Sequence, residues 1–228
     1  PQTVWTWLLL MYFIPILGFV LYLVIGQDFH KSRMFKAKEI EGELKYAVRR
    51  QEETIYHKRL RLANSEMNRF KDLILYNLEA GEAVLTDNND IRIYTDGKAK
   101  FRALIDEMKQ AQKYIHLQYY IIRNDELWQE IEKVLIQKAR EGVQVRVLFD
   151  SMGCRTMHNK DWKRLEAEGI MVAEFFPALL GKLQLRVNYR NHRKIVVIDG
   201  RIGFVGGFNV GREYLGRDKK FGYWRDTH

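Results

Sequence analysis

Residues 191–215 read NHRKIVVIDGRIGFVGGFNVGREYL, and this stretch decides the fold class. The run IVVI at 195–198 is strand-like, and the Asp199-Gly200 pair after it is a strong signal for a two-residue hairpin turn. The residues that follow, RIGFVG, can form the returning strand. The stretch therefore predicts two antiparallel strands joined at Asp199.

Upstream of this hairpin, helical and strand-like patterns alternate. Apolar residues at helical spacing predict helices over 98–113, 126–141 and 160–168, and apolar runs predict strands over 114–122, 144–149 and 171–176. Strands that alternate with helices of crossover length are typical of α/β proteins. We therefore expect an α/β fold in residues 81–228, with a layered mixed sheet flanked by helices.

The composition bounds the class of protein. The 228 residues are 46% hydrophobic and 13% aromatic, which is enough to bury a core and excludes a disordered chain. A single cysteine, Cys154, excludes a disulfide framework and a cysteine-based zinc site. The net charge of +9 is concentrated in residues 31–61, which carry +5, and residues 181–228, which carry +7.

Residues 4–25, VWTWLLLMYFIPILGFVLYLVI, contain no charged side chain. As one helix these 22 residues would measure about 33 Å, against about 30 Å for the hydrocarbon core of a bilayer. Residues 1–30 are therefore predicted to form a transmembrane helix, in preference to a signal peptide or a buried core helix. Pro15 is compatible with this prediction because spanning helices tolerate proline.

The charges after the apolar run predict its orientation. Four basic residues follow it, Lys31, Arg33, Lys36 and Lys38, whereas the residues before it carry no charged side chain. The positive-inside rule then places the remainder of the chain in the cytoplasm, at the cell membrane. Residues 31–80 are expected to be a helical connector, whose basic side chains either attract anionic head groups or form a solvated helix face.

His192 and Lys194 are the leading candidates for chemistry. Residues two apart on a strand point to the same side, with about 6–7 Å between their backbones. An imidazole can attack phosphorus or carry a proton, and an ammonium can neutralise phosphate oxygens. The pair therefore suits phosphoryl transfer without a metal ion.

Three further residues of the stretch are candidates for supporting roles. Asp199 is favoured as a turn residue, although a carboxylate can also orient a histidine and stabilise its cation. Gly206-Gly207 permits a close approach of the backbone, and the amide of Asn209 can donate to a phosphate oxygen.

In combination, His192-x-Lys194, Asp199 and Gly206-Gly207-x-Asn209 resemble the signature of the phospholipase D superfamily. NYRNHRKIVVIDG, GFVGGFNVG, EYLG and FGYWRDTH further resemble the first catalytic half of bacterial cardiolipin synthases. The upstream HLQYYI, VRVLFDSMG and EFFP and the apolar N-terminal segment are similar to the same family. The resemblance covers nearly the whole chain and implies a phospholipase D-like fold.

The resemblance also implies an activity. The family condenses two phosphatidylglycerol molecules into cardiolipin and glycerol through a phosphohistidine intermediate, without a metal or other cofactor. On this chain it implies that His192 is the nucleophile or its acid/base counterpart, that Lys194 grips phosphate, and that Asp199 supports a histidine. Gly207 and Asn209 would help to hold the phosphate. The expected partners are phosphatidylglycerol and anionic membrane lipid, and no nucleic acid.

This chain departs from the family pattern in three ways. Gly207 stands where many superfamily members have serine, and Arg212 stands where an aspartate is expected. The family carries two His-x-Lys-x4-Asp motifs, whereas this chain has one, so we expect a fragment whose second motif comes from a missing C-terminal half or from a second copy. The alternatives are a phospholipase D-type phosphodiesterase, acting on lipid or nucleic acid, and a non-catalytic tether that binds anionic lipid.

Overall fold

A computed structural model of the chain describes residues 2–22, 46, 48–54, 65–81, 83–86, 89–175 and 190–228. The chain divides into two compact units, Pro1–Arg92 and Ile93–His228. All the strands of the described residues, and the predicted site residues, lie in the second unit.

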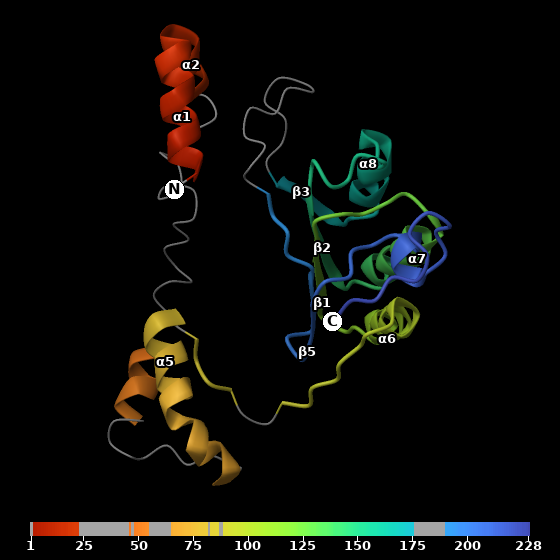
Figure 1. The fold of residues 1–228 in the computed structure, drawn as a ribbon. Helices are drawn as coiled ribbons and strands as arrows, with labels where there is room; N and C mark the ends of the chain where they lie inside the picture. The colour runs from red at the N-terminus through yellow and green to blue at the C-terminus, as the bar shows by residue number, and fades with distance from the viewer. Residues whose placement is uncertain are drawn as a thin grey trace. The chain divides into compact units, whose positions relative to one another are not determined.

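The second unit is built on a mixed five-stranded sheet with the order β3-β2-β1-β4-β5 (Figure 1). Its strands are β1 (Tyr114–Tyr119), β2 (Gln144–Asp150), β3 (Met171–Phe175), β4 (Ile195–Ile198) and β5 (Ile202–Val205). The first three strands are parallel, whereas β4 runs antiparallel to β1 and β5 antiparallel to β4. The mixed sheet and the β4–β5 hairpin confirm the sequence prediction.

Three α-helices pack on one face of the sheet (Figure 1): α6 (Gly97–Lys109), α7 (Glu126–Arg140) and α8 (Asn159–Ala167). The side chain of Asp96 caps α6, and that of Asp125 caps α7 by accepting N–H groups of the first turn. The ring of Trp162 on α8 stacks on Phe149 of β2 with 3.9 Å between the ring centroids. The core therefore lies between this helical layer and the alternate, fully buried residues of the central strands.

The opposite face of the sheet is more open. His116 and Gln118 of β1 are only partly buried on this face, and Met171 on β3 and Val205 on β5 are exposed. In residues 93–175 and 190–228, no α-helix packs on this side. The second unit thus has two layers, helices on one side and a half-open sheet on the other.

In the first unit, the apolar segment forms two short helices in place of the predicted single one. Helix α1 (Gln2–Phe13) ends before Ile14, and α2 (Pro15–Leu21) begins with a proline. Because Pro15 has no N–H to donate and disfavours helical geometry at the residue before it, Ile14 adopts a φ of −136° and a ψ of 71°. The prediction of one continuous helix over residues 4–25 is therefore wrong, and residues 23–45 lie outside the described residues.

The two short helices pack against each other. A Cβ at Gly18 of α2 would lie 2.8 Å from the carbonyl oxygen of Leu10 on α1, so glycine permits this close approach. The rings of Trp7 and Tyr22 also meet, with 5.5 Å between their centroids. Among the described residues, the structure contains no helix that combines the length and apolar character needed to cross a membrane.

The predicted connector is helical where it is described. Residues 48–54 are helical, and a short helix, η2 (Ser65–Phe70), leads into α5 (Lys71–Gly81). The side-chain amide of Gln51 binds the backbone N–H and carbonyl of Leu85 at 2.7 and 2.8 Å. This pair of hydrogen bonds ties the extended segment after α5 to the preceding helical segment.

Candidate active site

The candidate site forms where three chain segments meet at one end of the sheet. The carboxyl ends of the parallel strands β1 and β2 lie beside the amino end of β4, because β4 runs antiparallel to β1. Tyr120 follows β1, Asp150 ends β2, and His192 and Lys194 precede β4. Ligand sites of open α/β sheets commonly form at the carboxyl ends of the strands.

His192 is held between an aromatic ring and an ammonium group. Its imidazole stacks on the ring of Tyr120 with 3.8 Å between the centroids, and its Nδ1 lies 3.0 Å from Lys194 Nζ. Partial burial lowers the pKa of His192, and the charge of Lys194 lowers this pKa further, although Asp150 acts in the opposite direction. The surroundings therefore favour a neutral imidazole, which is the form that can act as a nucleophile or base.

Lys194 is largely buried, with 7% of its surface exposed. Its Nζ lies 2.5 Å from the carbonyl oxygen of His192 and 5.5 Å from the ring centroid of Tyr120. Burial lowers the pKa of Lys194, whereas the nearby carboxylate of Asp226 raises it. The ammonium is thus partly desolvated, a setting in which it attracts an incoming phosphate more strongly than in water.

Asp150 was not identified from the sequence. Its carboxylate is buried and accepts the N–H of Asn191 at 3.1 Å and the N–H of Met152 at 2.9 Å. It therefore joins the end of β2 to the segment that carries His192. The signal available in the sequence was an aspartate directly after the buried strand run VRVLF.

Gly206 and Gly207 allow residues 226–228 to pass close to the site. A Cβ at Gly207 would lie 2.0 Å from the carboxylate oxygen Oδ1 of Asp226, and one at Gly206 would lie 2.4 Å from the carbonyl oxygen of Thr227. The backbone N–H of Gly207 donates to this Thr227 carbonyl at 2.8 Å. Asp226, another residue that the sequence analysis missed, is thereby brought close enough to act on the pKa of Lys194.

Asn209 lies deeper, and both ends of its amide are bound within the protein. Its Oδ1 accepts the N–H of Ile121 at 3.1 Å, and its Nδ2 donates to the hydroxyl of Tyr214 at 2.9 Å. Tyr214 belongs to the short helix η3 (Arg212–Leu215). In this arrangement Asn209 joins the end of β1 to η3, and its predicted contact with phosphate stays a prediction.

Asp199 lies at the other end of β4 from His192 and Lys194. It occupies the hairpin turn with a φ of 55°, and its carboxylate accepts the backbone N–H groups of Gln112, Lys113 and Tyr114, each at 2.8–2.9 Å. These hydrogen bonds lower the pKa of Asp199. The structure therefore does not bring Asp199 together with His192, and the carboxylates near the site are those of Asp150 and Asp226.

Arg212, the residue with reversed charge, lies on η3. Its backbone N–H donates to Asp125 at 2.7 Å, and its guanidinium lies 3.8 Å from the carboxylate of Asp218. The arginine thus has a local acidic partner within its own loop. The structure shows no contact between it and His192 or Lys194.

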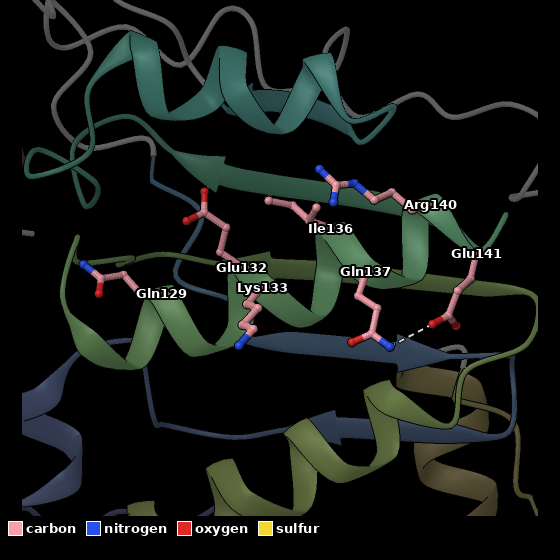
Figure 2. Close-up of a pocket in the computed structure, with 7 residues that line it drawn as sticks. All are labelled: Gln129, Glu132, Lys133, Ile136, Gln137, Arg140 and Glu141. Carbon is pink, nitrogen blue, oxygen red and sulfur yellow. Dashed lines mark hydrogen bonds between the residues drawn. The ribbon is translucent and has the colours of Figure 1, made fainter.

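Figure 2 shows a pocket of about 500 Å³ on helix α7. Its lining residues are Gln129, Glu132, Lys133, Ile136, Gln137, Arg140 and Glu141. Several of its charged groups are already paired: Arg164 of α8 binds Glu132, and Arg140 binds Glu168. Because neither His192 nor Lys194 lines this pocket, it does not belong to the candidate site.

Two curated bacterial proteins are similar to this chain over nearly its whole length. "Cardiolipin synthase 2" of Staphylococcus epidermidis is 47% identical over 228 residues, which cover 100% of this chain and 47% of the relative. "Major cardiolipin synthase ClsA" of Bacillus subtilis is 47% identical over 229 residues, covering 98% of this chain and 47% of the relative. The chain thus spans about half the length of these curated relatives.

Two solved structures are also similar. Phosphatidylserine synthase of Haemophilus influenzae matches with a TM-score of 0.47 and 19% identity, over 60% of this chain and 31% of that one. NucT of Helicobacter pylori matches with a TM-score of 0.44 and 16% identity, over 60% of this chain and 80% of that one. The family model described as "Cardiolipin synthase, PLD-like domain" matches residues 104–221, more than half of the chain. The chain therefore belongs to the cardiolipin synthase family with the phospholipase D-like domain.

Proposed function

We propose that this chain supplies the first catalytic half of a cardiolipin synthase, which transfers a phosphatidyl group between two phosphatidylglycerol molecules and releases glycerol. The observation that carries the proposal is the imidazole of His192 beside the Lys194 ammonium, 3.0 Å apart, in a chain of this family. In this proposal residues 1–30 are a membrane anchor, residues 31–80 a helical connector, and residues 81–228 the catalytic half.

The reaction is a double displacement at phosphorus. A histidine nitrogen bonds to the phosphorus of the first phosphatidylglycerol, the bond from phosphorus to the glycerol head group breaks, and an acid protonates the departing glycerol oxygen. The hydroxyl of a second phosphatidylglycerol then attacks the phosphohistidine, loses its proton to a base, and forms cardiolipin. His192 is either the attacking group or the acid/base that serves it.

The Lys194 contact suggests how substrate prepares His192. While the ammonium donates to Nδ1, the proton of a neutral imidazole is on Nε2, which is then unable to attack. A phosphate that draws the ammonium away leaves Nδ1 free to hold the proton, and the lone pair of Nε2 becomes available. Asp226, which raises the pKa of Lys194, supports the charged ammonium that this step requires.

We propose that the protein acts at the cell membrane with its catalytic half on the cytoplasmic side. The support is the uncharged run of residues 4–25, many of whose described side chains are exposed large hydrophobic groups, among them Leu9, Phe13 and Ile16. Basic residues follow the run, as the positive-inside rule requires of a cytoplasmic flank.

The test is the turnover of phosphatidylglycerol by the natural protein that contains this chain. His192→Ala should reduce the formation of cardiolipin by at least about 10³-fold, as expected for loss of a nucleophile or proton donor. Lys163→Ala, an exposed position on α8, is the matched control and should retain activity. Unchanged activity in His192→Ala with retained lipid binding would instead support the tether, and release of phosphatidic acid would support a hydrolase.

A further inference from the structure

A loop beside the candidate site combines exposed aromatic and cationic side chains. We call residues 217–224, RDKKFGYW, the aromatic–basic loop. Phe221 is 46% exposed and Tyr223 is 68% exposed, and the side chains of Lys219 and Lys220 are also exposed. Exposed apolar groups that lie together and are bordered by polar residues often mark an interaction site with a protein or a membrane.

Hydrogen bonds and aromatic contacts hold the loop against the rest of the unit, so that these side chains have a defined position. Asp218 accepts the N–H of Lys220 through its side chain and the N–H of Gly222 through its carbonyl, both at 2.9 Å. The ring of Trp224 packs edge-on against Tyr214, with 5.0 Å between centroids, and against Phe221 at 5.8 Å. Trp224 therefore anchors the loop to η3, while Phe221 and Tyr223 extend its apolar surface to the outside.

The charges of the loop indicate the kind of partner. Asp218, its one carboxylate, is matched with Arg212. Within residues 89–175 and 190–228, no carboxylate lies within ion-pair distance of Lys219 or Lys220. Tyrosine and tryptophan favour the boundary between apolar and aqueous phases, and lysines near an anionic bilayer are attracted to its head groups.

We propose that the aromatic–basic loop docks on the surface of an anionic lipid bilayer, with Phe221 and Tyr223 entering the head-group boundary and Lys219 and Lys220 binding lipid phosphates. This inference rests on the proposed action at a membrane and adds a second point of contact to the N-terminal segment. Asp226 follows the loop directly and lies against Gly207. Docking would therefore bring the end of the sheet that carries His192 and Lys194 close to the lipid head groups.

The test places an environment-sensitive fluorophore on the full chain through Tyr223→Cys, with Lys163→Cys as the matched exposed control. The natural Cys154 is buried and should not be labelled in the folded chain. The chain is mixed with vesicles of phosphatidylglycerol and phosphatidylcholine, or of phosphatidylcholine alone, and brominated acyl chains serve as quenchers. The label at position 223 should shift to the blue and be quenched in the anionic vesicles, and the label at 163 should not.

The double variant Lys219→Glu/Lys220→Glu should abolish the shift at position 223, and so should high salt, because both weaken attraction to the head groups. If the chain sediments with anionic vesicles while the label at 223 stays in water, the loop proposal is overturned and membrane action stands. If the chain does not sediment with them, both fail. A blue shift that appears without lipid would assign the loop to a protein interface and overturn the proposal.

Discussion

At the scale of single residues, the protonation of His192 is the property most directly set by its neighbours. Burial and Lys194 lower the pKa of His192 below its ordinary value of 6.5. Replacing the ammonium by Lys194→Met should therefore raise this pKa, whereas Arg193→Met, at an exposed neighbouring position, should change it little. NMR titration of the imidazole signals measures both, with His192→Gln to assign the signal. A Lys194→Met variant whose His192 titrates as before would contradict the proposed contact.

The same shift predicts a dependence of stability on pH. The unfolded chain takes up a proton at His192 near pH 6.5, whereas the folded chain does so only at lower pH. The unfolded state therefore binds more protons between these two pKa values, and His192 contributes a loss of stability as the pH falls below about 6.5. His192→Gln should remove this part of the pH dependence in denaturant titrations.

Asp150 carries a second prediction at the residue scale. Asp150→Ala leaves the N–H groups of Asn191 and Met152 without their acceptor, and should lower the free energy of unfolding by roughly 1–3 kcal/mol. Asp150→Asn keeps an acceptor oxygen but removes the charge that raises the pKa of His192, so this pKa should fall. Thermal melting and the His192 titration separate the two effects. If Asp150→Ala melts at the same temperature as the natural chain, the hydrogen bonds of Asp150 contribute nothing to stability.

The sequence could predict some of these residues and not others. His192 and Lys194 follow from a spacing of two beside a strand-like run, and that information is local. Asp150 contacts a segment 41 residues away, and the position of Asp226 depends on a backbone packed against Gly207. Such contacts join residues far apart in the sequence, and the local pattern of apolar and polar residues does not predict them. The local pattern favours Asp199 as a turn residue, and the structure places it in the hairpin turn.

At the scale of elements, Asp199 joins the β4–β5 hairpin to the segment between α6 and β1. Removing its three backbone hydrogen bonds by Asp199→Ala should lower the free energy of unfolding by roughly 1–3 kcal/mol at neutral pH. The pKa of Asp199 is lowered in the folded chain, so its stabilisation is present above the unfolded value near pH 3.8 and is lost as the pH falls through the folded value. Denaturant titrations measure the free energy of unfolding at neutral and acidic pH. The difference in this free energy between Asp199→Ala and the natural chain should be smaller in acid.

Gly203 on β5 and Gly207, two residues after the end of β5, offer a matched pair of variants. At Gly207 a Cβ would meet the carboxylate of Asp226 at 2.0 Å, whereas at Gly203 on β5 it would meet no atom within 4 Å. Gly207→Ala should therefore destabilise the chain by roughly 1–3 kcal/mol through overpacking, and Gly203→Ala should be nearly neutral. Thermal melting compares them directly. An equal effect of the two substitutions would contradict the packing of Asp226 on Gly207.

Most elements of the second unit lie within a few residues of their predicted bounds because their patterns are strong. The helix predicted at 126–141 is Glu126–Arg140, and its start is encoded by the capping aspartate before it. The helices of the apolar N-terminal run were harder to predict. Its uncharged composition suits one long helix, but the chain bends at Ile14 because Pro15 interrupts the backbone hydrogen bonds and Gly18 lets the second helix pack on the first.

At the scale of the whole molecule, we expect that a single copy of this chain cannot catalyse the proposed reaction. The proposed double displacement needs one group to attack and another to protonate the departing oxygen, and the sequence contains a single His-x-Lys-x4-Asp motif, at His192, Lys194 and Asp199. His228 near Gly206 is a poor substitute, because burial lowers its pKa to about 3 and the ring would be neutral, and so a weak acid, at neutral pH. We therefore expect the second imidazole to come from another polypeptide segment or from a second copy. We expect the purified chain to turn over phosphatidylglycerol only when copies associate, with specific activity rising with protein concentration and falling in dilute, monomeric samples. Light scattering measures the association of copies, and thin-layer chromatography detects the product. Full activity from a monomer would contradict this expectation and would mean that His192 can serve as both nucleophile and acid.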